Sequence, residues 1–193
     1  VVALARQHQL VVVHDLAYGG IAFDGFQPPS FLQVPGAKEV GVEFTTMSKT
    51  FNMASWRIGY CSGRAEVISG LARGKGYYDY GIFQAIQIAS VIALRHCVDD
   101  MREQARVYEN RRDVLCTGLE RAGWQVTPPS GTMFVWAPIP EPYAQMGSLE
   151  FAVQCLQKAE VAVAPGRGFG EDGEGFLRIA LVENAHRLQQ AVR

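Results

Sequence analysis

The chain has 193 residues, 48% of them hydrophobic and 19% charged, and a formal net charge of −1. This composition is that of a globular protein with one sizeable domain and room for part of a second, without the basic excess that nucleic acid or an anionic membrane would attract. The most hydrophobic stretch, residues 82–94, is too short and too often interrupted by polar side chains to cross a bilayer.

The first residues, 1–9, already follow a helical pattern, and the last ones, 186–193, end within another. We therefore expect the chain to be part of a longer protein. Its four cysteines form no CxxC pair and no cluster with histidine. This spacing argues against a bound metal and favours reduced thiols in a cytoplasmic protein.

Residues 1–98 are expected to form part of an open α/β sheet. The apolar run at 10–13 predicts a strand that is buried on both faces. The next predicted elements are strands at 39–46 and 56–62, a helix at 65–74 closed by Gly74, and an aromatic loop at 76–81. The helix predicted at 82–94 is apolar nearly all round, and we therefore expect it to be buried.

Residues 99–193 have a different texture, which predicts a smaller α+β domain. A long helix is expected from Asp99 or Asp100 to Ala122, where Gly123 fits the stop. The elements predicted after it are strands at 124–127, 132–137, 161–164 and 176–182, and helices at 149–159 and 186–193. The long helix would connect this domain to the larger one.

Asp15 and Tyr18 lie in a turn at the carboxyl end of the first strand, where open α/β sheets bind their ligands. A carboxylate in such a turn can simply accept a hydrogen bond from the local backbone as an Asx-turn. A partly buried carboxylate can instead keep a heterocyclic nitrogen protonated, and a phenol can hydrogen-bond an adjacent oxyanion. The sequence leaves both interpretations open.

Thr46, Ser48, Lys49 and Arg57 follow the second predicted strand. A lysine at the end of a buried strand is costly unless it is paired or covalently used. The plain alternative is a surface loop with scattered polar side chains. The functional interpretation is a Schiff-base lysine, with hydroxyl groups and a bidentate guanidinium around a phosphate.

Arg178 lies among apolar neighbours in the last predicted strand. The alternation of that strand allows the side chain to face outward. If it faces inward, its guanidinium needs an anion, and a substrate carboxylate fits.

Four segments together resemble the fold-type I, pyridoxal 5'-phosphate (PLP)-dependent class I/II aminotransferases. They are residues 14–18 (HDLAY), 48–59 (SKTFNMASWRIG), 131–136 (GTMFVW) and 176–180 (FLRIA). The lysine segment, with 22–25 and 78–81, is most similar to the branch that holds alanine and LL-diaminopimelate aminotransferases. The resemblance implies the C-terminal half of such an enzyme: part of the mostly parallel sheet of the PLP-binding large domain in 1–98, and the interdomain helix and small domain in 99–193.

The resemblance also implies roles around the PLP ring. Lys49 would form a Schiff base with the cofactor and move the proton of the substrate α-carbon. Asp15 would keep the pyridine nitrogen protonated, so that the ring accepts electrons. Tyr18 would hydrogen-bond the ring 3′ oxygen.

Further roles concern the phosphate and the substrate. Arg57 and Thr46, with Ser48 beside them, would bind the phosphate of PLP. Arg178 would bind the α-carboxylate of the substrate. No metal is implied.

The activity that the resemblance implies is transfer of an amino group between an α-amino acid and a 2-oxo acid, in a homodimer whose partner subunit residues 77–81 could reach. Two alternatives stay open: a PLP-dependent carbon–sulfur lyase that eliminates at the β-carbon, and a non-catalytic aminotransferase-like sensor domain. The family's phosphate loop and ring-stacking aromatic residue would precede Val1. We therefore expect this chain alone to be inactive and to expose an edge of its sheet. The motifs do not indicate which amino acid is the substrate.

Overall fold

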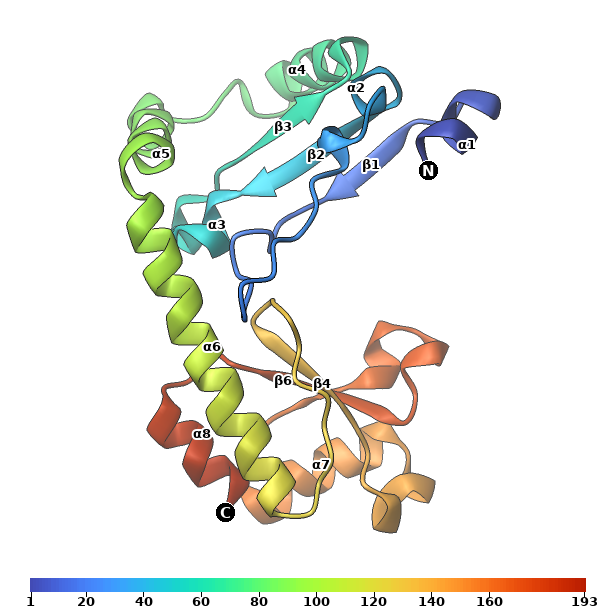
Figure 1. Cartoon of the computed structure of the whole chain (residues 1–193), viewed down its shortest axis with the longest axis vertical. Coiled ribbons are helices and arrows are strands. Elements are labelled where there is room, and N and C mark those ends of the chain that lie inside the picture. The colour runs from blue at the N-terminus through green and yellow to red at the C-terminus, as the bar shows by residue number, and fades with distance from the viewer. The chain divides into compact units, whose positions relative to one another are not determined.

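A computed structural model describes the whole chain, residues 1–193, which divides into two compact units, 1–105 and 106–193. The long helix α6, Val98–Arg121, begins in the first unit and ends in the second (Figure 1). The domain boundary expected after residue 98 stays a prediction. None of the helices combines the length and the apolar composition that a membrane crossing needs.

The first unit is built on a three-stranded sheet in the order β1–β2–β3 (Figure 1). β1, Val12–Asp15, runs parallel to β2, Gly41–Thr46, and β3, Gly59–Gly63, pairs antiparallel with the other side of β2. The helices of this unit before α6 are α1 (Val2–Gln7), α2 (Ala37–Val40), α3 (Met47–Thr50), α4 (Ala65–Asp79) and α5 (Gln84–His96), with 3₁₀ turns at Phe31–Gln33 and Ala54–Trp56. The α/β class predicted from the sequence is confirmed.

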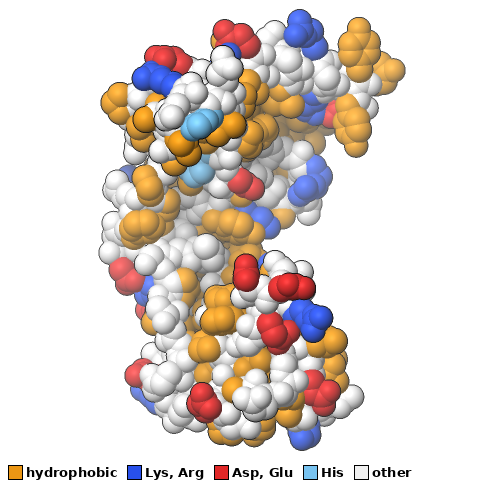
Figure 2. All heavy atoms as spheres, turned by 90° about the vertical axis from the view of Figure 1, so that its right-hand side faces the viewer, with side chains coloured by type: hydrophobic (Ala, Val, Ile, Leu, Met, Phe, Trp, Pro, Cys, Tyr) orange, Lys and Arg blue, Asp and Glu red, His pale blue; other side chains and the backbone are white.

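The core of the first unit lies along β2 and the segments that cover it. Ile21, Phe23, Val42 and Met47 are almost completely buried there. The prediction that the first strand is buried on both faces is wrong for this chain, because Val13 is 64% exposed. The side chains of Val11, Val13 and Asp15 alternate along the chain and are all exposed, so one face of β1 is uncovered. Hydrophobic side chains reach the surface of both units (Figure 2).

Helix α4 continues past the glycine that was expected to close it. It runs to Asp79, so the aromatic loop predicted at 76–81 is mostly helical, and Tyr80 ends it in the left-handed conformation at φ 56°. A glycine inside a helix costs only about 1 kcal/mol relative to alanine, which a continuing hydrogen-bond ladder can offset. Lys75 and Asp79 form an ion pair one turn apart that supports this last stretch.

Helix α5 forms where it was predicted, but it is not buried. Only Ser90 and Ala93 are buried, while Ile88 and Ile92 are 53% and 51% exposed. The apolar composition predicted the helix correctly, but the chain supplies no element that covers these side chains. The structure, which describes residues 1–193, therefore leaves the apolar face of α5 exposed.

The second unit packs helices against one face of an antiparallel sheet in the order β4–β6–β5 (Figure 1). Its strands are β4 (Phe134–Pro138), β5 (Ala164–Pro165) and β6 (Phe176–Ala180), and its helices after α6 are α7 (Ser148–Ala159) and α8 (Ala185–Val192). Phe151 and Ala152 of α7 pack with Leu177 of β6 and with Ile139 in the main buried cluster. The α+β character predicted for the C-terminal part is therefore confirmed.

Three predictions in this unit need correction. The strand predicted at 161–164 shares only Ala164 with β5, which is Ala164–Pro165. Residues 124–127 form no strand, because Trp124 instead packs on the core cluster and donates its indole N–H to the Pro138 carbonyl at 2.7 Å. Asp99 and Asp100 do not cap α6, which already begins at Val98, and both lie in its first turn, where negative charge favours the helix dipole.

Candidate functional site

The sheet of the first unit brings several predicted site residues to one edge, the end at which β1 and β2 finish. Because β1 and β2 are parallel, their carboxyl ends meet, and Asp15 pairs with Phe44 two residues before Thr46. The antiparallel β3 begins beside the same edge, since Gly59 pairs with Thr46. Arg57 therefore lies just before the strand that flanks Thr46.

Lys49 is carried by the single turn of helix that continues β2. Its Nζ lies 5.7 Å from the centre of the Tyr18 ring, so the structure brings these two predicted residues together. The segment that carries Tyr18 packs closely on the turn, because a Cβ on Gly20 would lie 2.6 Å from the Thr50 hydroxyl oxygen. Glycine at position 20 thus allows the two segments to meet.

Thr46 has a structural task as well as its predicted role. Its hydroxyl oxygen accepts a hydrogen bond from the Ser48 amide at 3.1 Å, which caps the turn, and donates to the Ile58 carbonyl at 3.3 Å. Ser48 is buried. Arg57 adopts the left-handed conformation at φ 53°, which is uncommon for a residue other than glycine, and donates one N–H to the Ala54 carbonyl at 3.0 Å.

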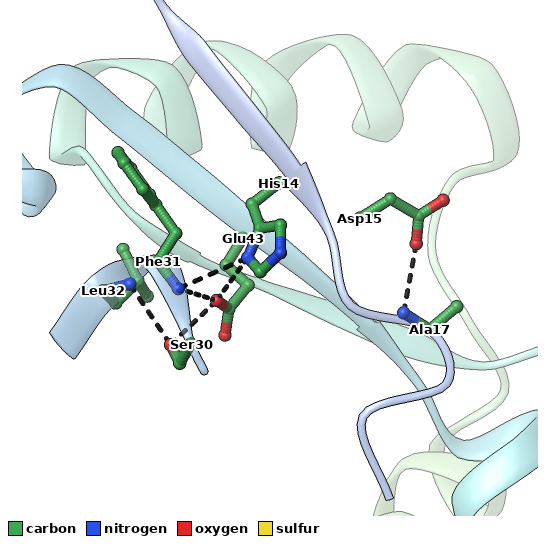
Figure 3. Close-up of polar contacts among 7 residues, drawn as sticks. All are labelled: His14, Asp15, Ala17, Ser30, Phe31, Leu32 and Glu43. Atoms are coloured by element: carbon green, nitrogen blue, oxygen red, sulfur yellow. Dashed lines mark hydrogen bonds and ion pairs between the residues drawn. The ribbon is translucent and has the colours of Figure 1, made fainter. Parts of the chain in front are cut away.

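Asp15 forms the Asx-turn that was one of its two predicted interpretations. Its Oδ1 accepts a hydrogen bond from the Ala17 amide at 3.1 Å (Figure 3). The carboxylate is exposed rather than partly buried, because it lies on the same uncovered face of β1 as Val13. An Asx-turn uses one lone pair of one oxygen and leaves the carboxylate able to bind a protonated nitrogen.

The sequence interpretation missed Glu43, whose carboxylate is the best connected polar group in the first unit. Its Oε2 accepts hydrogen bonds from the Ser30 hydroxyl at 2.8 Å and the Phe31 amide at 2.9 Å, and lies 2.8 Å from His14 Nδ1 (Figure 3). A carboxylate only accepts, so the His14 contact is a hydrogen bond when the ring carries a hydrogen on Nδ1, and the Phe31 amide also lies 3.4 Å from this nitrogen. A lone acidic residue inside an apolar strand is the signal that could have predicted it.

These contacts determine the ionisation of Glu43. Burial alone raises the pKa of the carboxyl, but the hydrogen bonds from Ser30, His14 and Phe31 lower it, and the net pKa lies below the ordinary value. The network ties the end of β1 to the following loop and to β2. It therefore fixes the strand position immediately before Asp15.

Arg178 belongs to the second unit, on the open face of its sheet. It pairs with Trp136 on β4 and with Ala164 on β5. Its guanidinium carbon lies 4.2 Å from the centre of the Phe134 ring and 4.4 Å from that of Phe169. The side chain is half-buried and lines a groove of ≈ 550 Å³.

Several charged side chains of these sites have no oppositely charged partner within the chain. Lys49, Arg57 and Arg178 form no salt bridge with any residue from 1 to 193, and neither does Asp15. A cluster of a carboxylate, an amine and a guanidinium at one sheet edge can bind a ligand with both a cationic and an anionic part. A separate guanidinium can bind a carboxylate.

The family model for aminotransferase class I and II matches residues 1–193. The chain therefore belongs to this family. It is 54% identical to the glutamate-pyruvate aminotransferase AlaC of Escherichia coli, over 100% of the chain and 47% of that protein. It is 47% identical to the LL-diaminopimelate aminotransferase of Moorella thermoacetica, over 100% of the chain and 48% of that protein. The branch of the family expected from the sequence is confirmed.

Solved structures agree with this assignment. The apo-BacF structure from Bacillus subtilis matches 99% of the chain with a TM-score of 0.93 and 35% identity, and the chain covers 48% of it. A probable N-succinyldiaminopimelate aminotransferase from Thermus thermophilus matches 98% of the chain with a TM-score of 0.90 and 38% identity. The chain thus spans about half the length of the relatives it matches.

Proposed function

We propose that the protein to which this chain belongs is a PLP-dependent aminotransferase, which transfers an amino group between an α-amino acid and a 2-oxo acid. The observation that carries the proposal is the position of Lys49. It lies at the carboxyl end of β2, 5.7 Å from the Tyr18 ring and without a salt-bridge partner. Membership of the class I and II family supports the same reaction.

The residues at the sheet edge suit PLP. Lys49 would hold the cofactor through its amine, and Asp15 would hold its pyridine nitrogen. Tyr18 would donate a hydrogen bond to its ring oxygen, and Arg57 would hold its phosphate together with Thr46 and Ser48. The fit rests on charges: an amine, a carboxylate and a guanidinium at one edge have no counterions within the chain.

Each residue has a task that follows from its chemistry. When bound, PLP withdraws electrons from the substrate α-carbon. The Asp15 carboxylate would keep a proton on the ring nitrogen by favouring its charged form. Lys49 Nζ would take the proton from the substrate α-carbon and deliver it to the cofactor, which keeps the amino group. Arg178 binds the α-carboxylate through paired N–H groups.

A homodimer is part of the proposal. Tyr77, Tyr78 and Tyr80 are 88%, 89% and 93% exposed, and Phe83 is 73% exposed. So many exposed aromatic rings in a short segment are typical of a protein–protein interface. A second subunit is the partner that the proposal assigns to this segment.

The test compares the full-length protein with a Lys49→Ala variant. The wild type, loaded with PLP, should have a visible absorbance band and convert a 2-oxo acid into an amino acid. Lys49→Ala should lose the band and at least a thousandfold in turnover, on the order expected when a covalent and proton-transferring group is removed.

A matched control is Lys38→Ala, which removes an exposed lysine from α2 in the same unit. It should leave both absorbance and turnover unchanged. A band that survives Lys49→Ala would contradict the proposal. Release of pyruvate and ammonia without a 2-oxo acid acceptor would instead identify a β-eliminating lyase.

A further inference from the structure

The guanidinium of Arg178 packs against two aromatic rings. Its Cζ lies 4.2 Å from the centre of the Phe134 ring and 4.4 Å from that of Phe169. The Arg178 side chain makes no hydrogen bond and no salt bridge with the described residues. The rings therefore hold the side chain while its N–H groups stay available to a ligand.

Both rings are themselves held in place. Phe134 lies in β4, and its amide donates a hydrogen bond to the Thr132 hydroxyl oxygen at 3.1 Å. Phe169 meets Trp136 edge-on, with ring centres 5.6 Å apart and planes at 74°. Trp136 in turn stacks on Phe176 at 5.6 Å and 19°. The rings form a connected group on the open face of the sheet.

The loop that carries Phe169 is also fixed. Gly166 and Gly173 approach so closely that a Cβ on either would clash with the backbone of the other. The Arg167 amide donates to the Ser148 hydroxyl oxygen at 3.1 Å, and this hydroxyl donates to Glu174 at 3.2 Å. Hydrogen bonds from the Ser148 and Gly175 amides lower the pKa of Glu174, which keeps this anchor ionised.

From this arrangement we infer that Phe134 and Phe169 are positioning residues, which hold Arg178 ready to bind the α-carboxylate of the substrate. An arginine loses rotamer freedom when it binds a carboxylate, and a side chain already held by its neighbours loses less. The inference rests on the proposed function, because it assumes that Arg178 binds this carboxylate. Through the ring of Phe169, the loop at 166–169 thereby contributes to substrate affinity.

The test uses the full-length protein with Phe134→Leu, Phe169→Leu and Phe169→Tyr. Each leucine variant should raise the KM for both the amino acid and the 2-oxo acid about threefold to tenfold, with kcat unchanged. The Kd of propionate, an unreactive carboxylate, should rise by the same factor in a direct binding titration. Phe169→Tyr keeps the ring and should retain the wild-type values.

Two further variants separate this inference from the proposed function. Tyr143→Leu removes a half-exposed ring of the same unit that packs on Phe151, away from Arg178, and should change none of these constants. Arg178→Lys should weaken propionate binding more than either leucine variant.

The outcomes are distinct. If Arg178→Lys raises KM and the propionate Kd while both leucine variants leave them unchanged, the positioning role is overturned and the role of Arg178 stands. If Arg178→Lys changes neither constant, the assignment of Arg178 in the proposed function fails. If the leucine variants lose kcat and also melt at a lower temperature, the inference is overturned as well, because these losses together indicate a merely structural effect.

Discussion

Three neighbours converge on one oxygen of Glu43, and their hydrogen bonds make the stability of the first unit depend on pH. The pKa of this carboxyl lies below its ordinary value, since the contacts with Ser30, His14 and Phe31 outweigh the effect of burial. A carboxyl whose pKa is lower in the folded state stabilises the fold above its unfolded pKa of about 4.3. That stability is lost as the pH falls through the folded pKa.

We therefore expect Glu43→Gln to destabilise the protein at pH 7 by about 1–3 kcal/mol, the range for losing charged hydrogen bonds at a buried site. The difference from the wild type should shrink below about pH 4, where the wild-type carboxyl also becomes protonated. Urea unfolding curves of both proteins at the two pH values measure this.

Glu39→Gln provides the matched control for this change. Glu39 pairs with Arg6 at 2.7 Å, but its side chain is 69% exposed, and such surface ion pairs contribute little. The control should unfold like the wild type at both pH values. Equal stability of Glu43→Gln and Glu39→Gln at pH 7 would show that the buried charge is unimportant.

The candidate residues differ in how well they could be predicted. Asp15 and Lys49 each follow an apolar run, so their local context alone marked them as polar groups at strand ends. The contacts of Glu43 join segments far apart in the sequence. The contact between Arg178 and Phe169 depends on the path of a glycine-rich loop, which local propensity does not determine.

At the scale of elements, the close approach of two segments explains the glycine at position 20. Its added Cβ would collide with the side chain of Thr50, a buried β-branched residue with little freedom to turn away. We expect Gly20→Ala to destabilise the protein by about 1–3 kcal/mol, as overpacking does. Thermal or urea unfolding measures the change.

A second substitution should rescue Gly20→Ala, and a substitution at another glycine provides the control. Adding Thr50→Ser removes the colliding methyl group, and the double variant should recover part of the lost stability. Gly74→Ala places a Cβ in open space within α4 and should stabilise that helix by about 0.5–1 kcal/mol. A Gly20→Ala variant as stable as the wild type would contradict the close packing of this segment on the turn at Lys49.

Most elements were predictable because their apolar periodicity reflects their own local structure. The prediction that α4 ends at Gly74 was wrong because a single glycine is a weak helix stop, and the helical hydrogen bonds continue to Asp79. The prediction that α5 is buried was wrong for another reason: periodicity identifies an apolar face but says nothing about what covers it. The same applies to Val13 on the edge strand.

At the scale of the whole molecule, the proposed homodimer has a candidate contact segment in the exposed aromatic rings. Tyr77, Tyr78 and Tyr80 lie at the end of α4 and Phe83 immediately before α5, in a unit whose α5 also exposes apolar side chains. Rings this large gain much from burial, and a soluble protein rarely leaves a contiguous group of them in water. Association of two subunits through this segment would remove them from solvent.

A full-length variant with Tyr77→Ser, Tyr78→Ser and Tyr80→Ser tests this directly. The wild type should have the mass of a dimer in light scattering after size-exclusion chromatography, and the variant should shift to half that mass, because the three rings no longer gain from burial. Tyr143→Ser, in the second unit, should remain dimeric. A triple variant that keeps the wild-type mass but melts at a lower temperature would contradict the interface, because the rings would then pack within one subunit.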